Sequence, residues 1–198
     1  MNFPTKLTVS RIILAIIIVF IMIFPFEAVG IDIPVIRSSV DISVKYIICC
    51  VLFIIASITD YFDGHLARKN NQVTDLGKVL DQIADKLLVS PILVVFASEG
   101  VINPIVPVVI VSRDIIVDTI RMDAASKGKV IAAKGYGKVK TASLMIGIIL
   151  LYINDVPFIY KNIRIDLLLI YFGTIMSVVS LVQYYQINKK INKPQIEN

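Results

Sequence analysis

The chain has 198 residues, of which 57% are hydrophobic and only 18% are charged, and its mean hydropathy is +0.81. This apolar share exceeds that of soluble globular domains and predicts an integral membrane protein. The net charge of +5 favours anionic lipid headgroups and anionic substrates as partners. The sequence has no pattern of basic and aromatic residues that would indicate nucleic-acid binding.

Six apolar segments follow one another along the chain, and each can cross about 30 Å of hydrocarbon as a helix. They are approximately Leu7 to Phe26, Val44 to Ala67, Leu76 to Ala97, Val101 to Ala125, Val139 to Phe158 and Ile165 to Ile187. The fold class that they predict is all-α: a polytopic membrane protein of six transmembrane helices, forming a single domain over residues 1–198.

The first segment follows two basic residues, Lys6 and Arg11, and could alternatively be a signal peptide. The stretch Ala28-Val29-Gly30 weakly resembles a cleavage site. The length of the apolar run and the membrane character of the rest of the chain favour a transmembrane helix.

The second and third segments carry four aspartates, Asp60, Asp63, Asp81 and Asp85, separated by a polar stretch that predicts a turn. In an antiparallel helical hairpin with a rise of about 1.5 Å per residue, Asp60 would stand opposite Asp85, and Asp63 opposite Asp81. Clustered carboxylates in apolar surroundings repel one another, so we expect cations between them. All-oxygen ligands suit Mg²⁺, Mn²⁺ or Ca²⁺ and not Zn²⁺, and two such ions would offset four charges.

These two segments together contain the pattern Asp-x-x-Asp-Gly-x-x-Ala-Arg, eight residues, then Gly-x-x-x-Asp-x-x-x-Asp. Its specified positions are Asp60, Asp63, Gly64, Ala67, Arg68, Gly77, Asp81 and Asp85. The pattern resembles the signature of CDP-alcohol phosphotransferases, which are membrane enzymes of phospholipid synthesis. The small residues of the pattern leave room for a ligand near the aspartates.

The resemblance implies direct displacement on CDP-diacylglycerol, with CMP as the leaving group. In the family pattern Mg²⁺ or Mn²⁺, as two ions, would be held by Asp60, Asp63, Asp81 and Asp85. Asp85 would also be the general base. The residues around the CDP moiety would be Asp60, Gly64, Ala67, Arg68 and Gly77, and the resemblance also implies a homodimer.

Other parts of the chain resemble the members of this family that use glycerol 3-phosphate as the acceptor. These parts are residues 4–11, 84–86, 113–114, 121 and 137–141. Thr5 and Gln82 depart from the residues that these members often carry. The acceptor would then be sn-glycerol 3-phosphate, and Thr8 would lie at the entrance of the site.

Four basic residues are candidates for binding the acceptor phosphate: Arg113, Arg121, Lys138 and Lys140. Arg113 lies within the fourth apolar segment, where it could instead be the structural partner of an aspartate such as Asp114 or Asp118. The other three lie near helix ends, where they could simply contact lipid headgroups.

Fifteen of the twenty Lys and Arg residues fall on one side of the membrane if both termini are placed there. The positive-inside rule makes this side the cytoplasm. We therefore expect a multi-pass protein of the cell membrane with cytoplasmic termini, whose polar cavity faces the cytosol and opens sideways to membrane lipids.

Two rival functions remain at this point. One is a sibling phosphatidyltransferase with another acceptor, such as inositol phosphate, serine, an aminoalcohol or phosphatidylglycerol, because these enzymes share the aspartate pattern. The other is a transporter for divalent cations or coupled to protons, because aspartates within membranes also mark ion paths.

Overall fold

The computed structural model of the protein describes residues 3–37, 41–69, 75–129, 135–156 and 164–191. The side chains of residues 3–5, 37, 61–69, 75–76, 78–79 and 190 are outside this description. Over the described residues the chain forms six α-helices: α1 (Phe3–Ile23), α2 (Val44–Lys69), α3 (Asp75–Ser98), α4 (Ile105–Ser126), α5 (Gly135–Tyr152) and α6 (Ile165–Ile191). These helices confirm the predominantly helical prediction.

The chain also contains a feature that an all-α prediction lacks, a two-stranded sheet between α1 and α2. After a short 3₁₀ helix, η1 (Glu27–Val29), strand β1 (Val35–Arg37) pairs antiparallel with β2 (Asp41–Ser43), with Ile36 opposite Ile42. Three-residue strands are too short for an alternating pattern to stand out in the sequence.

Prolines explain two of the differences between predicted and observed helix ends. Helix α1 ends at Ile23, shortly before Pro25, because the residue before a proline disfavours helical geometry. Helix α4 begins only at Ile105, directly after Pro104, and the backbone N–H of Ile105 donates to the side chain of Asn103 at 3.0 Å. Helix α5 begins earlier than predicted, because its first turn is polar and contributes nothing to an apolar segment. It also ends earlier, at Tyr152, shortly before Asn154 and Asp155, whose φ angles of 53° and 57° are not helical.

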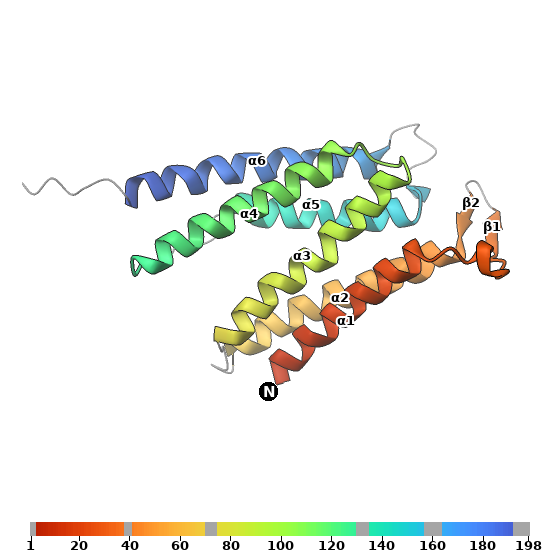
Figure 1. The fold of residues 1–198 in the computed structure, drawn as a ribbon, viewed down its shortest axis with the longest axis horizontal. Helices are drawn as coiled ribbons and strands as arrows, with labels where there is room; N and C mark the ends of the chain where they lie inside the picture. The colour runs from red at the N-terminus through yellow and green to blue at the C-terminus, as the bar shows by residue number, and fades with distance from the viewer. Residues whose placement is uncertain (1–2, 38–40, 70–74, 130–134, 157–163, 192–198) are drawn as a thin grey trace, which may run out of the picture.

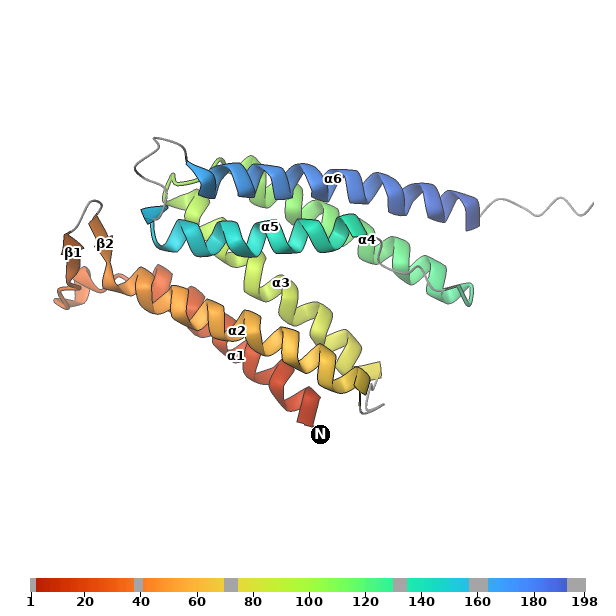
Figure 2. The same ribbon diagram turned by 180° about the vertical axis from the view of Figure 1, so that it is seen from behind.

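The helices are long and successive ones alternate in direction (Figure 1). Helices α1 and α2 lie side by side, while α5 lies along α6, and the view from behind shows the same neighbours (Figure 2). Helix α1 packs against both α2 and α3, α4 packs against α6, and contacts of α2 with α5 and of α3 with α4 join the two groups.

The outward faces of the helices are apolar, whereas several charged groups are buried. Phe20 on α1 and Ile175 on α6 are both 61% exposed, while Arg11 and Asp166 are fully buried. This arrangement is typical of a protein whose outer surface contacts lipid. Within the described part of the chain, two helices are long and apolar enough to cross a membrane, over Lys6–Ile23 and Ile165–Lys189.

Glycines allow α5 and α6 to approach each other closely, as small residues do in membrane helix pairs. A Cβ atom on Gly173 would lie 2.9 Å from both Cγ and Cδ2 of Leu144, and one on Gly147 would lie 2.8 Å from Cδ1 of Ile170. The helix contact therefore depends on the absence of a side chain at these two positions.

Gly173→Ala should accordingly lower the thermal unfolding midpoint of the protein in detergent. Overpacking costs about 1–3 kcal/mol, which exceeds the gain of about 1 kcal/mol from the better helix propensity of alanine. Gly135→Ala is the matched control, because a Cβ there meets nothing within 4 Å. Equal midpoints for the two variants would contradict the close approach.

Candidate active site

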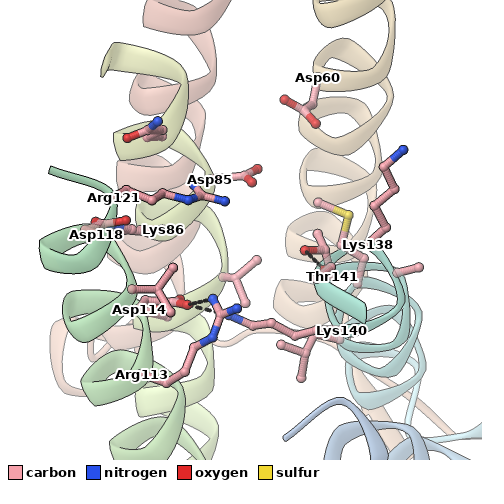
Figure 3. Close-up of a pocket in the computed structure, with 18 of the residues that line it drawn as sticks. Asp60, Asp85, Lys86, Arg113, Asp114, Asp118, Arg121, Lys138, Lys140 and Thr141 are labelled. Atoms are coloured by element: carbon pink, nitrogen blue, oxygen red, sulfur yellow. Dashed lines mark hydrogen bonds and ion pairs between the residues drawn. The ribbon is translucent and has the colours of Figure 1, made fainter. Parts of the chain in front are cut away.

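A cavity of about 520 Å³ lies among α2, α3, α4, α5 and α6, within the size range of small-molecule sites. Figure 3 shows side chains from several helices turned into it. Asp60 of α2 and Asp85 of α3 line it together, as do Arg121 of α4 and Lys138 of α5. One cavity thus joins candidate metal ligands to candidate phosphate-binding cations.

The acidic part of the cavity is formed by Asp60 and Asp85, which face it from two different helices (Figure 3). Oδ1 of Asp85 is buried and has no hydrogen-bond partner among the described residues. Asp60 forms an ion pair with Arg11 of α1, and the same guanidinium nitrogen, Nη1, donates to Oδ1 of Asp81 at 3.1 Å. Three of the predicted aspartates therefore lie around one small region between α2 and α3.

Arg11 contacts two of the predicted aspartates, a role that the sequence interpretation does not assign to it. There it is one of the basic residues at the start of the first apolar segment and the last residue of the segment 4–11 that carries the family resemblance. A signal was present in its spacing. The buried residues of α1 are Thr8, Arg11, Ala15, Ile18 and Met22. These positions recur every three or four residues and define one helix face, so Arg11 lies on the face that packs and not on the lipid face.

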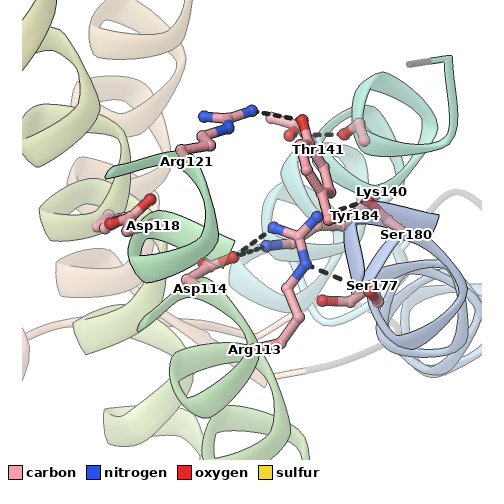
Figure 4. Close-up of polar contacts among 11 residues, drawn as sticks. Arg113, Asp114, Asp118, Arg121, Lys140, Thr141, Ser177, Ser180 and Tyr184 are labelled. Carbon is pink, nitrogen blue, oxygen red and sulfur yellow. Dashed lines mark hydrogen bonds and ion pairs between the residues drawn. The ribbon is translucent and has the colours of Figure 1, made fainter. Parts of the chain in front are cut away.

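A second polar cluster, around Asp114, also lines the cavity (Figure 4). Oδ1 of Asp114 accepts from Nη1 of Arg113 at 2.7 Å and from Nζ of Lys140 at 2.6 Å. Arg113 also donates through Nε to the carbonyl oxygen of Ser177 at 3.2 Å and through Nη2 to Oγ of Ser180 at 2.6 Å. Each of its three nitrogens therefore already has an acceptor.

Arg121 is bonded less completely than Arg113. Its Nη2 donates to the hydroxyl of Tyr184 at 2.6 Å, with the guanidinium 5.0 Å from the centre of the tyrosine ring, but its buried Nε has no partner among the described residues. Lys138 lines the cavity, is exposed, and makes no ion pair within the described part of the chain. Lys86 is paired with Asp118.

The structure describes the side-chain surroundings of only some of the remaining predicted site residues. Thr8 is buried on α1 one turn before Arg11 and is not among the residues that line the cavity, and Gly77 is half-buried near the start of α3. Four predicted residues lie on the last turns of α2 with side chains outside the described part of the structure: Asp63, Gly64, Ala67 and Arg68. Their predicted roles stay predictions.

The side chains of Asp60, Asp81 and Asp85 are of the chemical type that binds a hard divalent cation. They offer carboxylate oxygens only, and the buried Oδ1 of Asp85 is an acceptor that lacks a protein donor among the described residues. Among those residues, no three His, Cys, Asp or Glu side chains are grouped closely enough to hold a metal ion by themselves. The fourth predicted ligand, Asp63, has its side chain outside the described part of the structure.

The chain matches the sequence model of the CDP-alcohol phosphatidyltransferase family over residues 1–182. It is 36% identical over 187 residues to the CDP-diacylglycerol--glycerol-3-phosphate 3-phosphatidyltransferase of Bacillus subtilis, covering 94% of this chain and 95% of that one. It is 32% identical over 195 residues to the protein of the same name from Haemophilus influenzae, covering 95% and 94% of the two chains. The protein therefore belongs to the CDP-alcohol phosphatidyltransferase family.

Proposed function

We propose that the protein transfers the phosphatidyl group of CDP-diacylglycerol to sn-glycerol 3-phosphate, giving phosphatidylglycerophosphate and CMP. The observation that carries this proposal is the single cavity that joins Asp60 and Asp85 to Arg121 and Lys138. The names of the relatives support the choice of both substrates.

The reaction is a direct displacement at the phosphorus atom that carries the diacylglycerol. A hydroxyl oxygen of the acceptor bonds to this phosphorus while the bond to the bridging oxygen of the diphosphate breaks, and CMP leaves. Asp85 takes the hydroxyl proton, since this residue lines the cavity and its Oδ1 has no protein donor among the described residues. No covalent intermediate with the protein is required.

Asp60, Asp63, Asp81 and Asp85 would hold the divalent ions that this family generally uses, Mg²⁺ or Mn²⁺, as two ions. Such ions, when bound, neutralise charge on the diphosphate and on the leaving CMP. The CDP moiety would lie at Asp60, Gly64, Ala67, Arg68 and Gly77, as the family pattern implies.

The acceptor phosphate binds at the cationic side of the cavity, next to Arg121 and Lys138. Arg113 and Lys140 contribute to the positive charge of this side but are already paired with Asp114. The glycerol hydroxyl can then point away from the cations and toward Asp85.

The protein crosses the cell membrane six times, as one domain, with both termini and the cavity on the cytoplasmic side, and it forms a homodimer. The alternating directions of the helices support six crossings (Figure 1). Polar and charged side chains of α2 to α5 line the cavity, so among the described residues these helices are less uniformly apolar than α1 and α6. The positive-inside rule gives the orientation.

Purified protein supplied with CDP-diacylglycerol and Mg²⁺ should release CMP with glycerol 3-phosphate and not with inositol phosphate, serine or glycerol. Product mass should identify phosphatidylglycerophosphate, and a chelator should stop the reaction. If only another acceptor supports turnover, the phosphatidyl-transfer reaction would be confirmed but the acceptor would not be glycerol 3-phosphate. No CMP with any acceptor would overturn the proposal and make cation flux across liposomes the next measurement.

A further inference from the structure

Arg11 is the largest side chain of the described residues that is fully buried, although it carries a permanent charge. An arginine in this position must be neutralised, because an unpaired buried charge is strongly destabilising. Among the described residues, two aspartates of the family pattern pair with it. The structure therefore places a protein cation at the aspartate cluster.

One nitrogen of Arg11 contacts side chains on two different helices. Nη1 contacts Asp60 of α2 and lies 3.1 Å from Asp81 of α3, and α1 packs against both of these helices. Two carboxylates that separate helices bring close together repel each other. A guanidinium fixed between them from a third helix holds them at a set spacing.

We infer that Arg11 is a positioning residue that sets the spacing of Asp60 and Asp81 for divalent-metal binding. This inference rests on the proposed function, which makes both aspartates metal ligands. A carboxylate offers two oxygens with about four acceptor positions, so it can accept from Arg11 and still bind a metal ion. Partners of this kind, which hold ligands in place, commonly contribute about 10- to 100-fold to metal affinity.

The test is a Mn²⁺ titration of the full-length protein in detergent, in which electron paramagnetic resonance measures free Mn²⁺. Arg11→Met should raise the Kd for Mn²⁺ by about 10- to 100-fold. Arg11→Lys should restore part of the affinity, because lysine keeps the charge but lacks the planar fork of arginine.

Two control variants separate positioning from charge and from packing. Lys6→Met removes a charge from an exposed position on the same helix, and Ile18→Ala removes a fully buried side chain from the same face of α1. Neither variant should change the Kd for Mn²⁺, although Ile18→Ala should lower the unfolding midpoint. If Arg11→Met fails to fold, Arg11→Lys carries the test.

An unchanged or lower Kd in a folded Arg11 variant would overturn this inference alone. A Kd that rises as much in Ile18→Ala as in Arg11→Met would also overturn it, since general loosening of α1 would then be the cause. Absence of Mn²⁺ binding by the wild-type protein would overturn the proposed metal site and this inference with it. CMP release by the wild-type protein tests the transfer reaction separately.

Discussion

Asp85→Asn should lower the rate of CMP release by about 10²- to 10⁴-fold, the usual contribution of a general base. The asparagine amide has nearly the same size as the carboxyl group but cannot accept the proton of the acceptor hydroxyl. It also loses the negative charge that a divalent ion requires. The chain should still fold, since Oδ1 of Asp85 has no hydrogen bond among the described residues that the change would break. The measurement is the initial rate with saturating CDP-diacylglycerol and glycerol 3-phosphate.

Asp123→Asn is the control for this prediction, because it makes the same chemical change on α4 outside the cavity, next to Lys127. It should retain nearly full activity. A rate for Asp85→Asn within threefold of wild type would contradict the assignment and move the role of proton acceptor to another cavity carboxylate. Asp60 would be the next candidate.

The sequence was sufficient to predict the six helices because each contains a long apolar run. The ends of a helix are harder to predict where its first or last turn is polar, because such a turn is helical without belonging to the apolar run. The first turn of α5 contains Gly135, Gly137 and Lys138, so an apolarity criterion begins the helix too late, whereas the helix hydrogen bonds begin at Gly135. The β1–β2 pair could not be predicted, because its stability comes from contact between two short strands and not from either strand alone.

The aspartate pattern predicts a cluster of acids but not which other side chain holds them together. The sequence predicts that α2 and α3 form a hairpin whose own contact brings the carboxylates together. In the structure α1 packs against both helices and contributes Arg11 to the same region. Packing by a third helix depends on tertiary structure and is not visible in the aspartate pattern. The only indication in the sequence is the spacing of Arg11, Ala15 and Ile18, which puts Arg11 on the same helix face as apolar residues.

The two possible roles of Arg113 could not be separated from the sequence, since an arginine in an apolar segment fits either. The structure provides the hydrogen-bond partners that distinguish them. Arg113 is only 9% exposed, and all three of its nitrogens donate to groups on α4 and α6. This bonding favours the structural role for Arg113 and leaves Arg121 as the better candidate for contact with phosphate.

Arg121→Gln should raise the KM for glycerol 3-phosphate by about 10- to 100-fold and leave the KM for CDP-diacylglycerol nearly unchanged. A hydrogen bond to a charged group contributes about 1.5–3 kcal/mol, and about 1.4 kcal/mol corresponds to a factor of ten. Arg121 has a buried nitrogen without an acceptor among the described residues, so it can bind phosphate without first giving up an ion pair. Steady-state kinetics with each substrate varied in turn would measure both constants.

Arg113→Gln is the matched comparison, because it makes the same change two turns earlier on α4. Breaking one side of a buried ion pair costs about 3–5 kcal/mol, so this variant should lose thermal stability while its KM for glycerol 3-phosphate changes little. A large rise in KM for Arg113→Gln with no change for Arg121→Gln would reverse the two roles. If neither variant changes the KM, Lys138 becomes the principal phosphate contact, because it is the other cation that lines the cavity without an ion pair among the described residues.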